Sequence, residues 1–232
     1  NALVHEGDET QDDAWFQALG EGAADLLDAA GVPYCKGGVM ASKPAWRHAL
    51  AGWSRLIESW TAAPAPEKLL SIDIFYDFVP VAGDLALAGR LAEQARLAAM
   101  QPLLAGVMAG QVARPAPPLG LLGGFRTQGG RLDLKLNGLY PLVAGARVLA
   151  LADGVAARGT LARLAAARAA GRLNDSDHDN WVADLQLFQD LILRQQVADL
   201  AAGQAPGSRV AVEGLPAGRQ AALKAALRRV AS

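Results

Sequence analysis

A proline-rich run interrupts the chain near its middle and separates two stretches with different hydrophobic patterns. The run reads Arg114-Pro-Ala-Pro-Pro-Leu-Gly, and its three prolines can continue neither a helix nor the interior of a sheet. A chain of 232 residues is long enough to form two modest domains. We therefore expect one domain over residues 1–115 and a second domain over residues 116–232.

The first stretch contains both strand and helix patterns. Ala2–His5 reads as a buried strand, and Gln11–Ala30 has apolar residues at the spacing of a helix. A second helix is expected after Ser42, because apolar residues recur three or four positions apart at Trp46, Leu50, Trp53, Ile57 and Trp60. Ser71–Val79 alternates between two faces, which is typical of a strand. We expect Ala2–His5 and Ser71–Val79 to lie in one sheet of an α/β domain.

The second stretch is mainly helical in pattern. Leucines alternate with polar residues over Leu132–Leu136, and from Leu139 onward the apolar residues recur at helical spacing. Helices are predicted to begin near Leu139, Thr160, Ser176 and Pro216. The predicted fold class is therefore α+β, with an α/β domain followed by an all-α helical bundle.

Charge and cysteine content limit the classes of function. Lys and Arg number 22 against 23 Asp and Glu, so no overall field attracts nucleic acid or an anionic membrane. The single cysteine, Cys35, excludes an internal disulfide and favours a reducing compartment. No uninterrupted apolar run reaches the roughly 18 residues that a membrane span requires. We expect a cytoplasmic protein without nucleic-acid or membrane partners, which binds anionic ligands through local charge.

Four separated blocks, in this order, carry a resemblance that extends over nearly the whole chain. The blocks are Asn1–Val4, Gly37–Ala41 with Trp46-Arg47, Tyr76–Phe78, and Leu132–Lys135 with Gly138 and Pro141. Together they resemble a family of nucleotidyltransferases that is often found behind cyclic-nucleotide-binding and CBS domains. That family is related to PII-type uridylyltransferases and glutamine synthetase adenylyltransferases.

The resemblance implies a metal site shared with residues upstream of the chain. In the family an Asp-x-Asp pair stands immediately before the tetrapeptide that Asn1–Val4 resembles, so we expect this chain to begin just after that pair and to be inactive alone. The pair and a third carboxylate hold Mg²⁺, which offsets charge during nucleotidyl transfer. Asp77 is the expected third carboxylate, as catalytic residue and metal ligand. From the residues alone, the favoured interpretation of Asp77 is a strand-end carboxylate that accepts from backbone N–H groups.

One departure weakens the phosphate-binding pattern of the family. The third block ends in an arginine in the family, whereas this chain has Val79 at that position. This departure weakens any phosphate-binding role of position 79.

The other candidate nucleotide- or substrate-binding residues are Gly37, Gly38, Arg47, Arg131, Asp133 and Lys135. The glycine pair either lets a nucleotide approach the backbone or makes a tight turn. Arg47 either contacts phosphate or is a solvated charge on a helix. The last three alternate with leucines and either line a cleft between the domains or form a salt bridge.

Three functions are compatible with these patterns. In the first, the intact protein transfers UMP or AMP from a nucleoside triphosphate to an acceptor such as another protein. Alternatively, the fold has become a regulatory module that senses a nucleotide without chemistry, which the valine at position 79 favours. A helical interaction scaffold is the third reading, and it would leave the charged candidates dispersed.

Overall fold

The computed structural model describes residues 1–64, 68–112, 116–120 and 123–231, which form two compact units. The first unit comprises Asn1–Ala99 and the second Met100–Ser232. The boundary expected near residue 115 lies outside the described residues.

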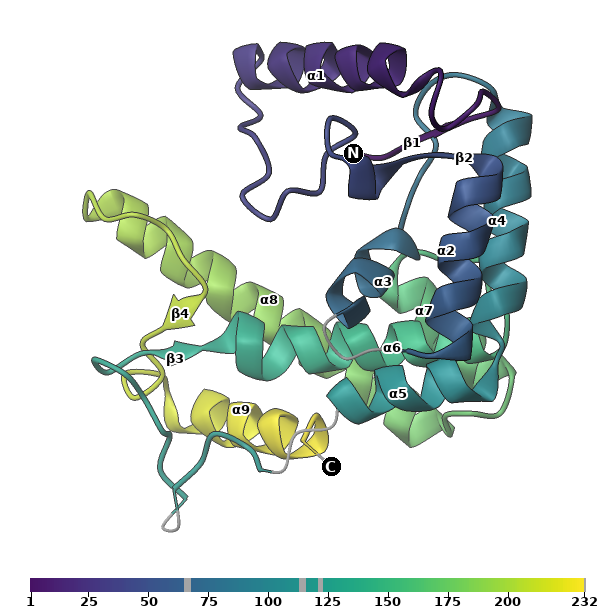
Figure 1. The fold of residues 1–232 in the computed structure, drawn as a ribbon. Helices are drawn as coiled ribbons and strands as arrows, with labels where there is room; N and C mark the ends of the chain where they lie inside the picture. Colours follow the sequence, from purple (N-terminus) through teal and green to yellow (C-terminus); the bar gives the residue numbers. More distant parts are fainter. Residues whose placement is uncertain (65–67, 113–115, 121–122, 232) are drawn as a thin grey trace. The chain divides into compact units, whose positions relative to one another are not determined.

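The first unit contains two short parallel strands and four α-helices among its described residues (Figure 1). Strands β1 (Leu3–His5) and β2 (Arg47–Ala49) pair with Leu3 opposite Arg47. The helices are α1 (Asp13–Ala29), α2 (Leu50–Ala62), α3 (Leu69–Phe75) and α4 (Leu85–Ala99), with a short 3-10 helix at Pro44–Trp46.

The predicted indole stripe forms the core of this unit. Trp53, Ile57 and Trp60 are buried on α2, which lies alongside α4 (Figure 1). Phe75 of α3 stacks on Trp53, with 5.0 Å between the ring centroids, and contacts Trp60 edge-on. The aromatic rings therefore join α2 and α3, as expected for a regular stripe of large apolar side chains.

The strand predicted over Ser71–Val79 is wrong, because this segment begins inside α3. The buried residues are Leu69, Ile72, Phe75 and Tyr76, whose three- and four-residue spacing is that of a helix. Alternation also required Ile74 to be buried, but this side chain is 38% exposed. The parallel partner of β1 is instead β2, which lies where the sequence pattern indicated the start of a helix.

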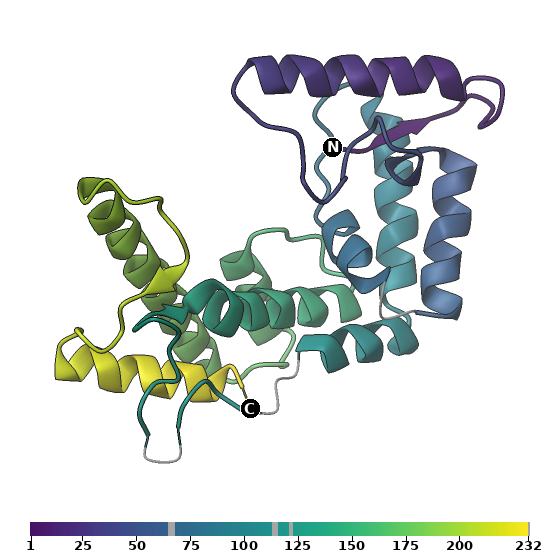
Figure 2. The same cartoon turned by 60° about the vertical axis from the view of Figure 1, so that its left-hand side comes forward.

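The second unit is mainly helical, as predicted. Its elements are α5 (Pro102–Val112), β3 (Leu132–Asp133), a π-helix (Lys135–Leu139), α6 (Tyr140–Ala152), α7 (Thr160–Ala169), α8 (Asp175–Ala201), β4 (Arg209–Val210) and α9 (Ala217–Arg229). Strands β3 and β4 pair in antiparallel fashion beside α8 (Figures 1 and 2). Over the described residues, no sheet has more than these two strands.

The helices of this unit enclose a continuous apolar core. Its fully buried members include Leu134, Phe188 and Leu223, from the β3 end, α8 and α9. The α8 helix begins as predicted, because the Asn174 side chain accepts a hydrogen bond from the Asp177 N–H at 2.8 Å. No helix in the described part of the chain is long and apolar enough to cross a membrane.

The alternation predicted over Leu132–Leu136 ends after Leu134. Leu132 and Leu134 are buried, but Leu136 is 51% exposed because the backbone turns into the π-helix. Asp133 and Lys135 therefore do not share one face of a strand.

Gly138 of the π-helix packs directly against Phe188. An ideal Cβ at this position would lie 2.9 Å from two carbons of the fully buried Phe188 ring. We expect Gly138→Ala to lower the free energy of unfolding by about 1–3 kcal/mol through overpacking, measured by urea denaturation. Gly218→Ala in α9 is the control, since its Cβ would meet no atom within 4 Å. Equal stability of the two variants would contradict this packing.

Candidate functional site

The segment Cys35–Ala41 is held against the first residue of the chain. The Asn1 amino nitrogen donates to the Val39 carbonyl at 2.9 Å, and the Ala41 N–H donates to the Asn1 side-chain oxygen at 2.7 Å. These bonds fix the start of β1 beside Gly37–Ala41, the glycine-containing block that resembles the family.

Arg47 fastens the same segment to α1. Its guanidinium donates to both carboxylate oxygens of Asp13, at 2.8 and 2.9 Å, and to the Ala41 carbonyl at 2.9 Å. This hydrogen bonding lowers the pKa of the Asp13 carboxyl. Arg47 is buried in β2, so the expected position on a helix face is wrong. A phosphate contact by Arg47 stays a prediction, and in this structure the side chain positions Ala41.

Gly20 allows α1 to approach the segment closely. An ideal Cβ at Gly20 would lie 2.6 Å from the Ala41 carbonyl carbon and 2.7 Å from the Ser42 nitrogen. Any side chain at position 20 would therefore collide with backbone atoms.

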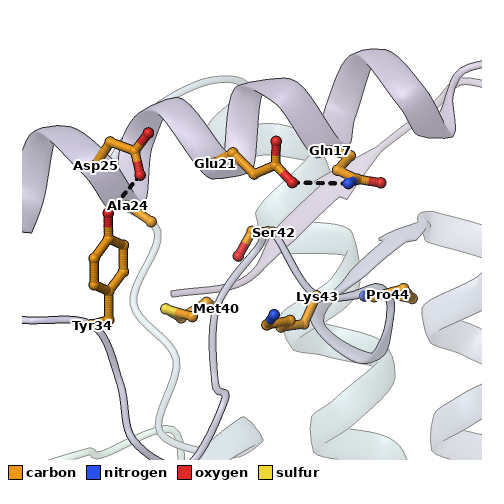
Figure 3. A pocket seen from close by; sticks show the side chains of 9 residues that line it. All are labelled: Gln17, Glu21, Ala24, Asp25, Tyr34, Met40, Ser42, Lys43 and Pro44. Atoms are coloured by element: carbon orange, nitrogen blue, oxygen red, sulfur yellow. Dashed lines mark hydrogen bonds between the residues drawn. The ribbon is translucent and has the colours of Figure 1, made fainter.

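A pocket of about 450 Å³ opens between α1 and the longer stretch from Tyr34 to Pro44, which contains this segment (Figure 3). Its lining residues are Gln17, Glu21, Ala24, Asp25, Tyr34, Met40, Ser42, Lys43 and Pro44. The volume is within the range of small-molecule sites. Because the segment is held by Asn1, Arg47 and the α1 backbone, the pocket has one preformed wall.

The glycine pair forms a turn next to the pocket. Gly38 has a φ of 71°, which favours glycine, and its N–H donates to the Cys35 carbonyl at 2.9 Å. Backbone N–H groups of Val39, Gly37 and Gly38 also lower the pKa of the exposed Cys35 thiol. This geometry agrees with the tight-turn interpretation, and close approach of a nucleotide to Gly37 and Gly38 stays a prediction.

Asp77 follows the last residues of α3 instead of a strand. Its N–H donates to the Ile74 carbonyl at 3.2 Å, and a carboxylate at a helix C-terminus is disfavoured by the helix dipole. Two residues earlier, Phe75 stacks on Trp53, whose indole N–H donates to the Leu3 carbonyl at 3.0 Å. The end of α3 is thus connected to β1 through one indole ring.

A complete metal site is not found within the described residues, because no three His, Cys, Asp or Glu side chains there could hold one ion together. Asp77 fits the chemistry of a magnesium ligand by its carboxylate, but it can supply only part of the ligand set. Other carboxylates would have to complete it.

In the second unit, Arg131 is tied to a buried carboxylate. Its guanidinium donates to both oxygens of Asp199, at 3.1 and 2.9 Å, and Gln195 also donates to Asp199. The hydrogen bonds from Arg131 lower the pKa of the Asp199 carboxyl. This salt bridge joins Arg131, the residue before β3, to α8. Arg131 therefore has a structural role, as the salt-bridge interpretation of the sequence predicted.

Asp133 and Lys135 have different surroundings. The Asp133 carboxylate accepts from the Ser208 hydroxyl at 2.9 Å and from the Leu136 N–H at 3.0 Å. Lys135 is exposed at the first residue of the π-helix. The structure does not bring Asp133 and Lys135 into a pair with each other, and their contact with a nucleotide stays a prediction.

Sequence reasoning missed the pocket residues on α1 and beside Ser42. Glu21 and Asp25 are four residues apart, which places both carboxylates on one helix face. That spacing was a usable signal. Tyr34 and Lys43 carry no comparable signal, because loop geometry alone brings them to the pocket.

Residues 101–232, more than half of the chain, match the family described as "Putative nucleotidyltransferase substrate binding domain". Residues 1–67 match the family described as "Putative nucleotidyltransferase DUF294". No curated protein and no solved structure matches the chain. The chain therefore belongs to the family of the "Putative nucleotidyltransferase substrate binding domain", preceded over residues 1–67 by a region that matches the nucleotidyltransferase model.

Proposed function

We propose that this chain acts within a nucleotidyltransferase that transfers UMP or AMP from a nucleoside triphosphate to an acceptor such as another protein. The family membership of both regions supports the reaction class. The observation that carries the proposal is the pair of hydrogen bonds that hold Asn1 against Val39 and Ala41. The Asp-x-Asp pair that the resemblance puts immediately before Asn1 would lie beside this segment and its pocket.

Asp77 would be the third carboxylate of this site. The connection of α3 to β1 through Trp53 supports the assignment, because both elements then border one region of the first unit. A bound Mg²⁺ would offset the negative charge of the triphosphate during in-line displacement. Asp77 would hold the ion, while Arg47 and Asn1 keep the neighbouring segment in place.

Calorimetric titration tests this function at the level of binding. We expect residues 1–232 to bind UTP or ATP weakly, with no gain from Mg²⁺, and to turn neither over. The protein extended upstream through an Asp-x-Asp pair should bind more tightly when Mg²⁺ is present. Equal affinity of the extended protein with and without Mg²⁺ would contradict the proposal.

Lys135 is the cation proposed to contact phosphate in the second unit. Arg131 and Asp133 are engaged within the protein, whereas Lys135 is exposed. In the extended protein, we expect Lys135→Glu to weaken triphosphate binding about five- to tenfold, the loss of one charge-assisted contact. The control is Arg158→Glu, which reverses another exposed charge. Identical weakening by both variants would mean that only overall charge matters.

A nucleotide-sensing regulatory module is the second candidate, favoured by one observation. Val79, in place of the arginine of the resembled family, is 57% exposed, and its side chain has no group that can donate to phosphate. In such a module, attached cyclic-nucleotide-binding or CBS domains would respond to nucleotide occupancy. Tight binding by the extended protein without any transfer would select this candidate.

A further inference from the structure

The pocket between α1 and the segment ending at Pro44 has two carboxylates held by uncharged donors. The Gln17 amide donates to Glu21 Oε1 at 2.8 Å, and the Tyr34 hydroxyl donates to Asp25 Oδ1 at 2.7 Å. Neither donor neutralises a negative charge. Each carboxylate has a second oxygen that can accept from a ligand.

The remaining lining suits a flat organic group. Ala24, Met40, Pro44 and the ring of Tyr34 supply apolar surface, and the volume of about 450 Å³ exceeds what a single ion needs. Figure 3 shows Glu21 and Asp25 on α1, with Met40 and Lys43 on the opposite side of the pocket.

Charge decides which part of a nucleotide this pocket can hold. Two carboxylates repel a polyphosphate, and Lys43 is the one cation among the lining residues. Hydroxyl groups, in contrast, donate well to carboxylates. Lys43 lies two residues after Ala41, whose N–H is bonded to Asn1, so a phosphate at Lys43 would point toward the proposed metal carboxylates.

We propose that this pocket binds the nucleoside part of a ribonucleotide, with Glu21 and Asp25 accepting hydrogen bonds from the ribose 2′- and 3′-hydroxyls. The base then lies against Tyr34 and Met40, and Lys43 contacts the α-phosphate. This inference rests on the proposed nucleotidyl transfer and assigns this pocket as the site that recognises the ribose of its nucleotide.

Nuclear magnetic resonance titration of residues 1–232 tests the pocket directly. The probes are UMP and AMP, each compared with its 2′,3′-dideoxy counterpart. We expect both ribonucleotides to shift the signals of Tyr34 and the Met40 methyl, and the dideoxy compounds to bind about tenfold more weakly. Glu21→Gln and Asp25→Asn should each weaken ribonucleotide binding about three- to tenfold and leave dideoxynucleotide binding unchanged.

Two further variants test whether the carboxylates act by contacting the ligand or by holding the loop in place. Tyr34→Phe removes the hydrogen bond to Asp25 but keeps the carboxylate, so discrimination between ribose and dideoxyribose should persist. Asp28→Asn lies on α1 outside the pocket and should change nothing. Equal binding of ribo- and dideoxynucleotides, or no binding up to about 10 mM, would overturn the inference. The inference would also be overturned if the nucleotides shifted only the signals of residues outside the pocket.

The inference and the proposed function fail in different ways. In one case, the extended protein transfers the nucleotidyl group at a rate that neither Glu21→Gln nor removal of the ribose hydroxyls changes. That result would support the proposed function and show that this pocket takes no part in it. In the other case, residues 1–232 bind ribonucleotides more tightly than dideoxynucleotides, but the extended protein transfers nothing. That result would support the pocket and contradict the transferase assignment.

Discussion

Replacing Gly20 with alanine is expected to destabilise the first unit by about 3 kcal/mol, because the new Cβ would meet backbone atoms only. The Cβ would lie 2.6–2.7 Å from Ala41 and Ser42 atoms, and backbone cannot rotate away as a side chain can. Relief requires α1 to move from the segment, which would break the pocket wall and strain the Asn1 hydrogen bond to Ala41. Urea denaturation followed by circular dichroism measures the loss.

Gly22→Ala supplies the matched control in the same helix. A Cβ at Gly22 would meet no atom within 4 Å, so the substitution should stabilise the helix by about 1 kcal/mol through helix propensity. If both variants stabilise the protein, α1 does not approach Ala41 as described.

The second large effect is expected in the other unit, where Arg229→Met would leave a buried carboxylate without its partner. Asp184 of α8 is 2% exposed, and its two oxygens accept from the Arg229 guanidinium, at 2.8 Å from Nε. We expect a loss of about 2–3 kcal/mol in the free energy of unfolding, at the low end for a buried pair because the guanidinium is partly exposed. Chemical denaturation measures it.

The same pair offers an internal check. Asp184→Leu combined with Arg229→Met removes both charges, so the double variant should recover most of the lost stability. Arg194→Met breaks the exposed pair with Asp190 and should shift the midpoint little. A double variant less stable than Arg229→Met alone would show that the charges matter for another reason.

The sequence predicted the helices of the second unit well because their apolar residues repeat over long stretches. The fully buried side chains of Phe188 on α8 and Leu223 on α9 follow this pattern. The prediction of a strand over Ser71–Val79 was wrong because a short apolar run is compatible with both the two-residue period of a strand and the 3.6-residue period of a helix. The burial of Leu69 and Ile72, three residues apart, fits the helix.

The candidate site was predictable only in part. The glycine block was recognised, and the structure holds it against Asn1. The contacts of Arg47 with Asp13 and of Arg131 with Asp199 were not predictable, since 34 and 68 residues separate the partners. Long-range pairs of this kind depend on tertiary packing and leave no local spacing signal. The pocket lining depends on a loop for the same reason.

Transfer of a labelled nucleotidyl group to the acceptor is the direct test of the proposed active site. The protein extended upstream through an Asp-x-Asp pair is incubated with its acceptor, Mg²⁺ and UTP or ATP labelled at the α-phosphate. We expect label on the acceptor, and a loss of about a hundredfold or more in Asp77→Asn but not in Asp73→Asn, which changes a carboxylate within α3. Transfer by Asp77→Asn at the unaltered rate, or by residues 1–232 alone, would contradict the assignment of this site.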